Sequence, residues 1–464
     1  MAGRRGLAHM TKDNIDVKIS IVMPLYNAER YISEALDSIY HQTFSEFEIL
    51  LVNDCSEDRT QQILDAYSTK DIRAKCITLH KRHGAGMARN IGMEHAKGKY
   101  IIFLDGDDIF HKDMLKKAYE KIVEFDSDLV CFDYTSALSE NIYKKVNKKK
   151  SRRFVEMFCK QCFKVTDMKL SDFRQINTAA WNKMYRLKYL EYNHLKFQNL
   201  PCCNDVFFVQ MSFFLAPKII MLDTEEAMLY FRIHEEKSRI AIHQNPMCGF
   251  YAFDAIQKEL IERGIFDKYY QYFYTSSFFN LHSLCITTKD DQQREEFDRY
   301  IREVAIDKWC TNRSEFDNLL VDFVKLQWEN WQKNGMEQIS EDVNIQFVIE
   351  DFGVQIIDQF LKWKAENRQV AIWGIGKRGR CLLRFLDRNC LYADRLIDSS
   401  EKKQGEIING LVVEAPDEFD MDIIVVTSVG IDKEIEAYIK ERSNKDIRIV
   451  QLDSIWEENI KCNK

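Results

Sequence analysis

The sequence predicts an α/β protein whose N-terminal half is a doubly wound, mainly parallel sheet. Continuous apolar runs recur along this half, and segments with apolar residues at helical spacing separate them. Strands that are buried on both faces show such continuous runs, and parallel strands need crossover helices. Polar residues also follow several of the runs, and this is the edge at which α/β sheets bind their ligands.

The individual elements follow in order from residue 18. Five apolar, β-rich runs predict strands, at 18–26, 47–54, 74–80, 99–104 and 127–134. Apolar residues at three- and four-residue spacing predict the intervening helices, at 27–42, 56–68 and 84–98. Ser56 stands where a side-chain cap would begin the second helix, and glycines flank the third helix.

Three acidic residues follow the fourth predicted strand in the stretch "FLDGDDIF", residues 103–110. Asp105, Asp107 and Asp108 would repel one another at this spacing unless a cation or water compensates them. A divalent cation with oxygen ligands neutralises carboxylates and a diphosphate together, and as a Lewis acid it stabilises a leaving nucleoside diphosphate. The pattern therefore favours a cation and a phosphate-bearing ligand at this strand end.

Three further polar signals fall at neighbouring strand ends. Asn27 follows the first strand, Asp54 ends the second, and "KRHGAGMARN" at 81–90 follows the third. Asp54 can accept a hydrogen bond from a base N–H. The segment at 81–90 combines cations, which suit phosphate, with glycines that let the backbone approach a ligand closely. All four signals predict one crevice beyond the carboxyl ends of the strands.

Composition limits the class of protein. The 464 residues are 45% hydrophobic and 30% charged, as in a globular chain of two or three domains. A net charge of −7 gives no overall positive charge of the kind that nucleic-acid-binding proteins show. The 13 cysteines are scattered along the chain and no apolar run is long enough to span a bilayer, so we expect reduced thiols and a cytoplasmic location. Residues 1–16 read as a tag or disordered tail, because "MAGRRGLAHM" resembles a vector scar.

Four stretches resemble, in order and spacing, the motif series of family 2 glycosyltransferases of the GT-A fold. They are "SIVMPLYNAERYISEALDSI", "EILLVNDCSEDRT", "GAGMARNIG" and "YIIFLDGDD". The resemblance assigns residues 17–240 to a catalytic domain. It implies an inverting enzyme that uses a nucleotide-sugar, typically a UDP-sugar, with Mn²⁺ or Mg²⁺ as cofactor. The acceptor implied is a saccharide or lipid-linked saccharide in bacterial surface glycan synthesis.

The resemblance also implies donor-side roles, residue by residue. The matching positions are Pro24, Tyr26, Asn27, Asp54, Arg89, Asp105, Asp107, Asp108 and Arg232. Asp54 matches the acid that reads the nucleobase. Asp107 matches the direct metal ligand, with Asp105 as its companion, and Asp108 is expected to brace the loop or meet the donor sugar.

Two more positions come from the stretch "AMLYFRIHEEKSRI", which resembles the end of the family's domain. Arg232 would meet the phosphates, and His234 would contact the metal or the diphosphate, although a histidine at a strand end is also commonly structural. Asn53 and Cys55 depart from the family pattern. Arg82 stands where the family often has asparagine, which leaves the preferred base open.

An inverting transfer needs a base that takes the proton of the incoming hydroxyl. The family carries it in a Glu-Asp pair before a helix, and "NLPCCNDVFFVQMSFF" at 199–214 matches that place. Asp205 is therefore the candidate base, with Asn204 in place of the family's glutamate; the alternative is that Asp205 only caps the helix. In "AAWNKMYRLKYL", Trp181 and Lys183 are expected to shape the acceptor side, with a core position as the alternative for Trp181.

The second half of the chain divides again. Residues 241–365 show helical spacing of apolar residues and predict a helical segment. Residues 366–464 return to strands and helices and resemble Rossmann-like domains appended to bacterial transferases. Their glycines and a later strand-end acid follow the dinucleotide fingerprint, at Gly374, Gly376, Gly379 and Asp398. The glycines either bind a second nucleotide or serve only a tight turn and close helix packing.

Seven of the ten residues at 144–153, "KKVNKKKSRR", are basic in a chain that is acidic overall. This segment is either a contact to anionic lipid headgroups, at the inner face of the cytoplasmic membrane, or a solvated loop. Two other functions also remain open. One is an NAD(P)-dependent oxidoreductase that works through the C-terminal domain, and the other is a non-catalytic nucleotide-sugar sensor or scaffold.

Overall fold

The computed structural model describes most of the chain as two compact units, residues 1–313 and 314–464. The described residues are 16–138, 141–146, 158–174, 176–224, 226–233, 245–288, 290–309, 328, 331–332, 353–388, 391–417, 419–427, 432–443 and 445–452. Each unit is presented by itself. The finer boundaries predicted at 240/241 and 365/366 stay predictions.

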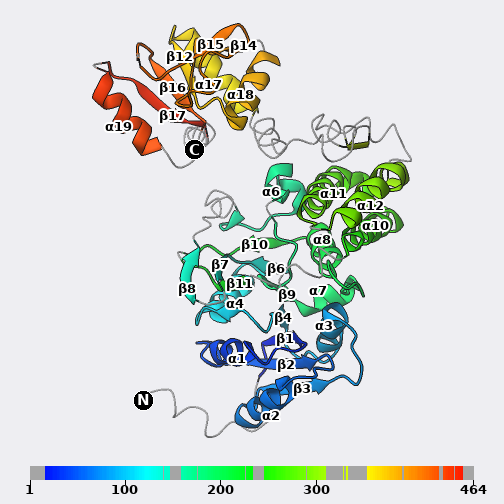
Figure 1. Ribbon diagram of the computed structural model, residues 1–464. Coiled ribbons are helices and arrows are strands. Elements are labelled where there is room, and N and C mark those ends of the chain that lie inside the picture. The colour runs from blue at the N-terminus through cyan, green and yellow to red at the C-terminus, as the bar shows by residue number, and fades with distance from the viewer. Residues whose placement is uncertain are drawn as a thin grey trace. The chain divides into compact units, whose positions relative to one another are not determined.

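A seven-stranded sheet forms the centre of the first unit (Figure 1). Its order is β10 (Ile219–Met221), β6 (Leu129–Cys131), β9 (Lys183–Arg186), β4 (Tyr100–Phe103), β1 (Ile19–Leu25), β2 (Phe47–Asn53) and β3 (Ala74–Thr78). The predicted strands β1, β2, β3 and β4 pair with one another in parallel, and β6 pairs in parallel with β10, which confirms the α/β fold class. The unpredicted strand β9 lies antiparallel between β4 and β6.

Four helices belong to the parallel part of this sheet. They are α1 (Ile32–Tyr40), α2 (Thr60–Lys70), α3 (Ala85–Glu94) and α4 (Met114–Glu124). On α1 the buried residues are Ile32, Ala35, Leu36 and Ile39. The spacing predicted these residues and Tyr40 on one face, but Tyr40, the last residue of the helix, is 40% exposed. Each large aliphatic side chain buried in this way contributes about 1.5–3 kcal/mol.

The predicted cap of the second helix is wrong. Helix α2 begins at Thr60, four residues after Ser56, and its N-cap residue is Arg59. Asp58 accepts the hydrogen bond of the Thr60 backbone N–H at 2.9 Å. Ser56 instead accepts a hydrogen bond from the backbone N–H of Asn27 at 3.0 Å, so its hydroxyl joins the loops that follow β1 and β2.

A small sheet and several short helices complete the α/β part of the first unit. The sheet order is β5 (Ile109–Phe110), β11 (Leu229–Ile233), β7 (Tyr134–Leu138) and β8 (Asn141–Val146). The helices are the 3₁₀ turn Val165–Asp167, α6 (Leu170–Arg174), α7 (Leu187–Tyr192) and α8 (Val206–Leu215). Because Tyr230 of β11 pairs with Ile109 of β5, the small sheet starts directly beside the DGDD segment.

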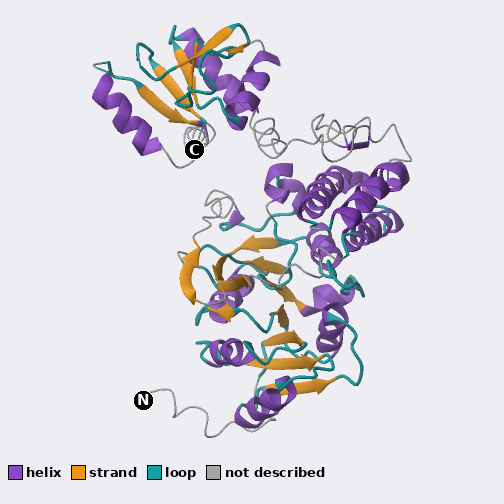
Figure 2. Cartoon of the chain, viewed as in Figure 1, coloured by secondary structure: helices purple, strands orange, loops and turns teal. Residues whose placement is uncertain are grey.

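The remaining described part of this unit is helical, as predicted for the middle of the chain (Figure 2). It contains α10 (Met247–Glu262), α11 (Phe266–Thr287), α12 (Asp291–Tyr300), a π-helical turn Ile301–Ala305 and α13 (Ile306–Trp309). These helices pack on α8, through a 2.8 Å hydrogen bond from Gln210 to Ser276 and a ring contact between Phe214 and Tyr269. No helix within the described ranges is both long and apolar enough to cross a bilayer.

The second unit is a smaller α/β domain. Its sheet order is β14 (Ile407–Ile408), β15 (Leu411–Glu414), β13 (Arg395–Ile397), β12 (Val370–Trp373), β16 (Ile423–Val426) and β17 (Arg448–Gln451). Only β14 pairs in the antiparallel sense. The helices are α17 (Gly353–Ala365), α18 (Lys377–Arg388) and α19 (Asp432–Arg442). A parallel sheet with crossover helices agrees with the fold class predicted here.

Candidate active site

The acidic loop, residues 105–108, directly follows β4. Asp105 and Asp107 are half-buried, whereas Asp108 is fully buried. Oδ1 of Asp108 accepts a hydrogen bond from the Arg232 backbone N–H at 3.0 Å, and Oδ2 accepts none within the described part of the chain. Burial, and then the charges of Asp107 and Asp105, raise the pKa of the Asp108 carboxyl well above its usual range. The position of Asp108 therefore disfavours the charged form of its carboxyl.

Arg232 braces this loop from the small sheet. Its side chain is only 2% exposed, and its Nε donates a hydrogen bond to the Asp107 carbonyl at 2.7 Å. Its Nη2 pairs with Glu34 at 2.8 Å, and the guanidinium lies 4.4 Å from the centroid of the Tyr31 ring. The predicted contact of Arg232 with donor phosphates stays a prediction, because these bonds direct the guanidinium toward protein groups.

Asp54 fixes the loop that leads into α3. Its two carboxylate oxygens accept hydrogen bonds from the backbone N–H groups of His83 and Gly84, both at 2.7 Å. Each carboxylate oxygen has a second acceptor position, so the predicted reading of a base N–H stays a prediction. Asn27 makes a similar link nearby, because its Oδ1 accepts from the Glu57 backbone N–H at 2.9 Å.

Pro24 and Tyr26 lie at the end of β1. Pro24 is half-buried in register with Val52 of β2, and Tyr26 is 36% exposed. The guanidinium of the exposed Arg82 lies 4.0 Å from the centroid of the Tyr26 ring, a cation–π contact. The residue that departs from the family pattern thus stacks on the predicted nucleotide-side tyrosine.

Arg89 lies between the acidic loop and the segment that carries Asp205. Its Nη2 pairs with Asp105 at 2.7 Å, and its Nη1 donates to the side-chain oxygen of Asn204 at 3.0 Å. A Cβ atom at Gly86 would lie 2.3 Å from the Gln198 carbonyl oxygen, so only glycine permits this close approach of α3. The guanidinium is buried, which places it between these partners rather than on the surface.

Asp205 occupies the N-cap position of α8, but its side chain makes no capping hydrogen bond. The alternative role as a cap therefore gains no support from the contacts. Asp205 is half-buried, and burial raises the pKa of its carboxyl, while the nearby charge of Arg89 acts in the opposite direction. A raised pKa makes a carboxylate a stronger base near neutral pH.

Lys183 is the first residue of β9, and Trp181 lies two residues before it. Because β9 is antiparallel, its first residue lies where β4 and β6 end. The Lys183 ammonium is buried and donates to the carbonyls of Asn177 and Ala179, at 2.7 and 2.8 Å. Trp181 is 7% exposed and stacks on Phe231. Trp181 thus takes the core position given as the alternative, and Lys183 fixes the preceding loop.

The acidic loop offers carboxylate oxygens, which are the ligands that Mn²⁺ and Mg²⁺ prefer. No group of three or more His, Cys, Asp or Glu side chains within the described ranges is arranged to hold a metal ion. Mg²⁺ is, however, commonly held by one or two carboxylates together with substrate phosphates, and Asp105 and Asp107 offer such oxygens. His234 and residues 147–153 of the basic segment lie outside the described residues.

Comparison with known proteins identifies the domain. Residues 20–214 match the family model described as glycosyl transferase family 2. The chain carries a family 2 glycosyltransferase domain. Over 232 residues, 48% of the chain, it is 31% identical to Glycosyltransferase GlyA of Streptococcus pneumoniae and spans 31% of that protein. Over 249 residues, 53% of the chain, it is 29% identical to Poly(ribitol-phosphate) beta-N-acetylglucosaminyltransferase TarS of Staphylococcus aureus and spans 41% of it. The chain thus matches less than half the length of either curated relative.

Solved structures agree on the fold of this glycosyltransferase domain. The crystal structure of Staphylococcus aureus TarS 1–349 superposes with a TM-score of 0.53 at 21% identity, over 71% of this chain and 91% of that chain. The structure of the same TarS segment in complex with UDP-GlcNAc gives a TM-score of 0.52 at 20% identity, with the same coverage. At these identities the likeness establishes the GT-A type of fold and no more.

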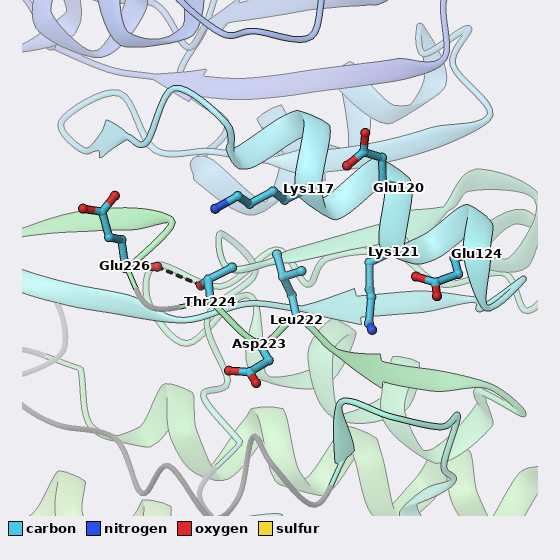
Figure 3. A pocket seen from close by; sticks show the side chains of 8 residues that line it. All are labelled: Lys117, Glu120, Lys121, Glu124, Leu222, Asp223, Thr224 and Glu226. Carbon is cyan, nitrogen blue, oxygen red and sulfur yellow. Dashed lines mark hydrogen bonds between the residues drawn. The ribbon is translucent and has the colours of Figure 1, made fainter.

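A pocket of about 480 Å³ lies elsewhere on the glycosyltransferase unit, between α4 and the segment after β10 (Figure 3). It is lined by Lys117, Glu120, Lys121, Glu124, Leu222, Asp223, Thr224 and Glu226. None of the predicted site residues lines it. Its charges are of both signs, and they select no class of ligand.

The C-terminal glycines make a turn that is closed by protein groups. Gly374 has φ +97°, and a Cβ atom at Gly379 would lie 2.2 Å from the Gly374 carbonyl oxygen. Asp398 accepts hydrogen bonds from the backbone N–H groups of Ile375 and Ser400, at 2.6 and 2.8 Å. Lys403 also pairs with Asp398 at 3.1 Å and lies beside Gly376. The second nucleotide site stays a prediction, and the contacts of Asp398 favour the tight-turn alternative.

Three residues of the site were not predicted from the sequence. Tyr31 and Glu34 hold the Arg232 guanidinium, yet nothing distinguishes them from other residues in the first turn of an amphipathic helix. Asn204 was seen only as a departure from the family pattern, although it is the partner of Arg89. Its place directly before the candidate base was the available signal.

Proposed function

We propose that this chain is a metal-dependent, inverting glycosyltransferase that moves a sugar from a UDP-sugar to a hydroxyl acceptor of a bacterial surface glycan. One observation carries the proposal: Arg89 contacts both the acidic loop and the residue next to Asp205, so an acidic donor side and a half-buried carboxylate share one sheet edge. A relative also supports it. TarS is named as a beta-N-acetylglucosaminyltransferase and has a structure in complex with UDP-GlcNAc. UDP-GlcNAc is therefore the first donor to test.

On the donor side, Asp105 and Asp107 would hold Mn²⁺ or Mg²⁺ together with the diphosphate. When bound, the cation supplies Lewis-acid stabilisation of the charge on the departing nucleoside diphosphate. Arg232 fixes the shape of the loop through the Asp107 carbonyl and the Asp108 carboxyl. Asp54 holds the loop at 83–84, which with Tyr26 and Asn27 would lie against the nucleoside.

On the acceptor side, Asp205 would take the proton from the acceptor hydroxyl. The acceptor oxygen then forms its bond to the anomeric carbon on the face opposite the diphosphate, and the bond from that carbon to the diphosphate oxygen breaks. The electron pair of the broken bond leaves with UDP, and the sugar is transferred with inverted configuration. The pKa of Asp205, raised by burial, suits this role because it brings the carboxylate closer to the basicity that proton transfer needs.

The test of this function measures UDP release. Wild type and the Asp107→Ala variant are incubated with a panel of UDP-sugars, each with Mn²⁺ and with EDTA. We expect slow hydrolysis of one donor, lost with EDTA and reduced at least about 10³-fold in the variant, because the charge on the leaving group loses its stabilisation. Asp223→Ala, at an exposed acid of the Figure 3 pocket, is the matched control and should keep the wild-type rate. Equal rates in Asp107→Ala and wild type would refute the metal-site assignment.

The basic segment at 144–153 suggests that the enzyme meets its acceptor at an anionic membrane surface. Neutralising its lysines and arginines to glutamine should abolish co-sedimentation with phosphatidylglycerol vesicles at low salt. Phosphatidylcholine vesicles are the control. Unchanged sedimentation of the neutralised variant would remove the membrane contact and leave a solvated loop.

A further inference from the structure

Helix α3 and the segment that carries Asp205 are fastened together at several points. Asn90 and Phe197 exchange two hydrogen bonds of 2.8 Å, between the Asn90 side chain and the Phe197 backbone. Gly86 admits the Gln198 carbonyl, which any side chain at this position would exclude. Donor-side and acceptor-side segments, more than a hundred residues apart in the sequence, are therefore one packed unit.

Arg89 is the charged member of this junction. One arm of its guanidinium reaches Asp105 at 2.7 Å and the other reaches the Asn204 amide oxygen at 3.0 Å. The guanidinium also lies 5.4 Å from the centroid of the Phe197 ring. Since the side chain is 7% exposed, most of its surface faces these partners, and little of it is available to a donor in solvent.

The neutrality of Asn204 has an electrostatic consequence. Asp105 already pairs with the Arg89 guanidinium, and the amide oxygen of Asn204 accepts a second hydrogen bond without adding the second negative charge that a carboxylate at this position would bring. The field of Arg89 can then act on the next residue, Asp205. Of the influences that lower the pKa of the Asp205 carboxyl, the Arg89 charge is the largest, and it opposes the effect of burial.

We propose that Arg89 is a positioning residue for Asp205: through Asn204 and Asp105 it ties the segment of the candidate base to the acidic loop, and its charge favours the carboxylate form of that base. This role deepens the proposed function and rests on it. It differs from the donor-binding role expected for Arg89, because the effect is exerted on the acceptor side.

Other charged groups near Asp205 also influence the pKa of its carboxyl. Asp105 raises the pKa of its carboxyl and Lys183, on β9, lowers it. Asp205 in turn contributes to the raised pKa values of Tyr185 on β9 and of Cys202 in the preceding segment. A change at position 204 keeps these titratable groups, and it alters the partner of Arg89 together with the hydrogen bond from the Asn204 amide to the Leu200 carbonyl.

The test substitutes Asn204 with aspartate, which is nearly isosteric and gives Arg89 a second carboxylate. The pKa of Asp205 is followed by ¹³C NMR of protein labelled at aspartate side-chain carbons, and its signal is assigned by its absence in Asp205→Asn. We expect N204D to raise the pKa of Asp205 by about one unit, because a second carboxylate offsets more of the Arg89 charge and adds a like charge beside Asp205. Asn199→Asp, at an exposed position of the same segment, is the matched control and should leave the pKa near the wild-type value.

A second variant covers the case in which N204D does not fold. Asn204→Ala removes the hydrogen bond but no charge, and it should lower the turnover of UDP-GlcNAc hydrolysis about tenfold while UDP binds as in wild type. An unchanged pKa of Asp205 in folded N204D, or a wild-type turnover in N204A, would overturn the role of Arg89. A wild-type rate in Asp205→Asn would instead overturn the base assignment of the proposed function, which the NMR titration does not depend on.

Discussion

Each of the two units places an acid at the end of a strand beside a glycine-containing turn, and the two acids are treated in opposite ways. Asp108 of the glycosyltransferase domain has one carboxylate oxygen without a hydrogen bond in the described structure, and two further acids lie next to it. Asp398 of the C-terminal unit accepts from two backbone N–H groups and pairs with Lys403.

Similar turns with an acid at a strand end can therefore have different roles, depending on whether protein groups compensate the acid. Protein groups already compensate Asp398, so its charge serves the fold of its own turn. The charge of the acidic loop is left partly uncompensated, which destabilises the protein unless another group is bound. Binding chemistry is therefore expected at the first turn, and a structural role at the second. The predictions below test this contrast, beginning with the largest effect.

The largest effect is expected for Asp205→Asn. Asparagine keeps the shape of the side chain but cannot take a proton, so the rate of donor turnover should fall about 10²–10⁴-fold. The dissociation constant of UDP, measured by calorimetry, should stay at its wild-type value because Asp205 lies on the acceptor side. Glu191→Gln, an exposed acid on α7, serves as the control. A parallel loss of UDP affinity would mean that the acceptor-side assignment is wrong.

A smaller loss is expected for Asp54→Ala. The variant leaves the backbone N–H groups of His83 and Gly84 without their charged acceptor, and such a hydrogen bond is worth about 1.5–3 kcal/mol. The loop at 83–84 would then have to be ordered by the nucleotide itself, and UDP affinity should fall at least about tenfold. Calorimetric titration with UDP measures this change, and unaltered affinity would separate Asp54 from the donor site.

Asp398→Ala should change stability without changing turnover. Losing the acceptor of the Ile375 and Ser400 N–H groups should cost about 1–3 kcal/mol within the C-terminal unit. Hydrogen exchange of peptides from 370–427, measured on the full chain, should be faster than in wild type, while UDP release stays the same. Tight NADH binding by wild type that this variant loses would reverse the comparison, because Asp398 would then serve a second nucleotide site.

The smallest effect concerns the pH dependence of stability. Because the folded-state pKa of Asp108 is raised above its ordinary value of 3.8, the folded protein binds more protons between the two values, and stability falls as pH rises through that window. Asp108→Asn removes this loss and should raise the midpoint of thermal unfolding by about 2–4 °C at pH 8, with little difference near pH 4.

Asp113→Asn should shift the midpoint of thermal unfolding at pH 8 in the opposite direction. The hydrogen bond from the Thr43 hydroxyl lowers the pKa of Asp113, so its carboxylate stabilises the fold above the ordinary pKa and this contribution is lost as pH falls. The variant should therefore unfold at a lower temperature at pH 8. If Asp108→Asn and Asp113→Asn shifted the midpoint in the same direction, the uncompensated charge of the acidic loop would be refuted.

Local pattern was enough to predict much of the molecule. Continuous apolar runs predicted the parallel strands, because a strand covered on both faces cannot alternate polar and apolar residues. The strand-end rule predicted that Asn27, Asp54, the segment at 81–90 and the acidic loop would gather at one edge. In the structure Asn27 bonds to Glu57, Asp54 holds Gly84, and Arg89 pairs with Asp105. Helical spacing likewise predicted the middle helices.

The tertiary structure decided which polar groups compensate which charges. Strand β9 runs against its neighbours, and only this direction brings Lys183 to the site edge. Ser56 accepts a hydrogen bond from the backbone N–H of Asn27 instead of capping the expected helix, because a hydroxyl can bond either to a helix end or to a neighbouring loop. Arg89 and Arg232 each have partners more than a hundred residues away in the sequence, and hydrogen bonding and electrostatics depend on distance in space. The sequence by itself thus determined the strands β1, β2, β3, β4 and β6, the helices α1 to α3 and the edge of the site. Three-dimensional packing decided the direction of β9 and which acids at that edge are compensated by protein groups.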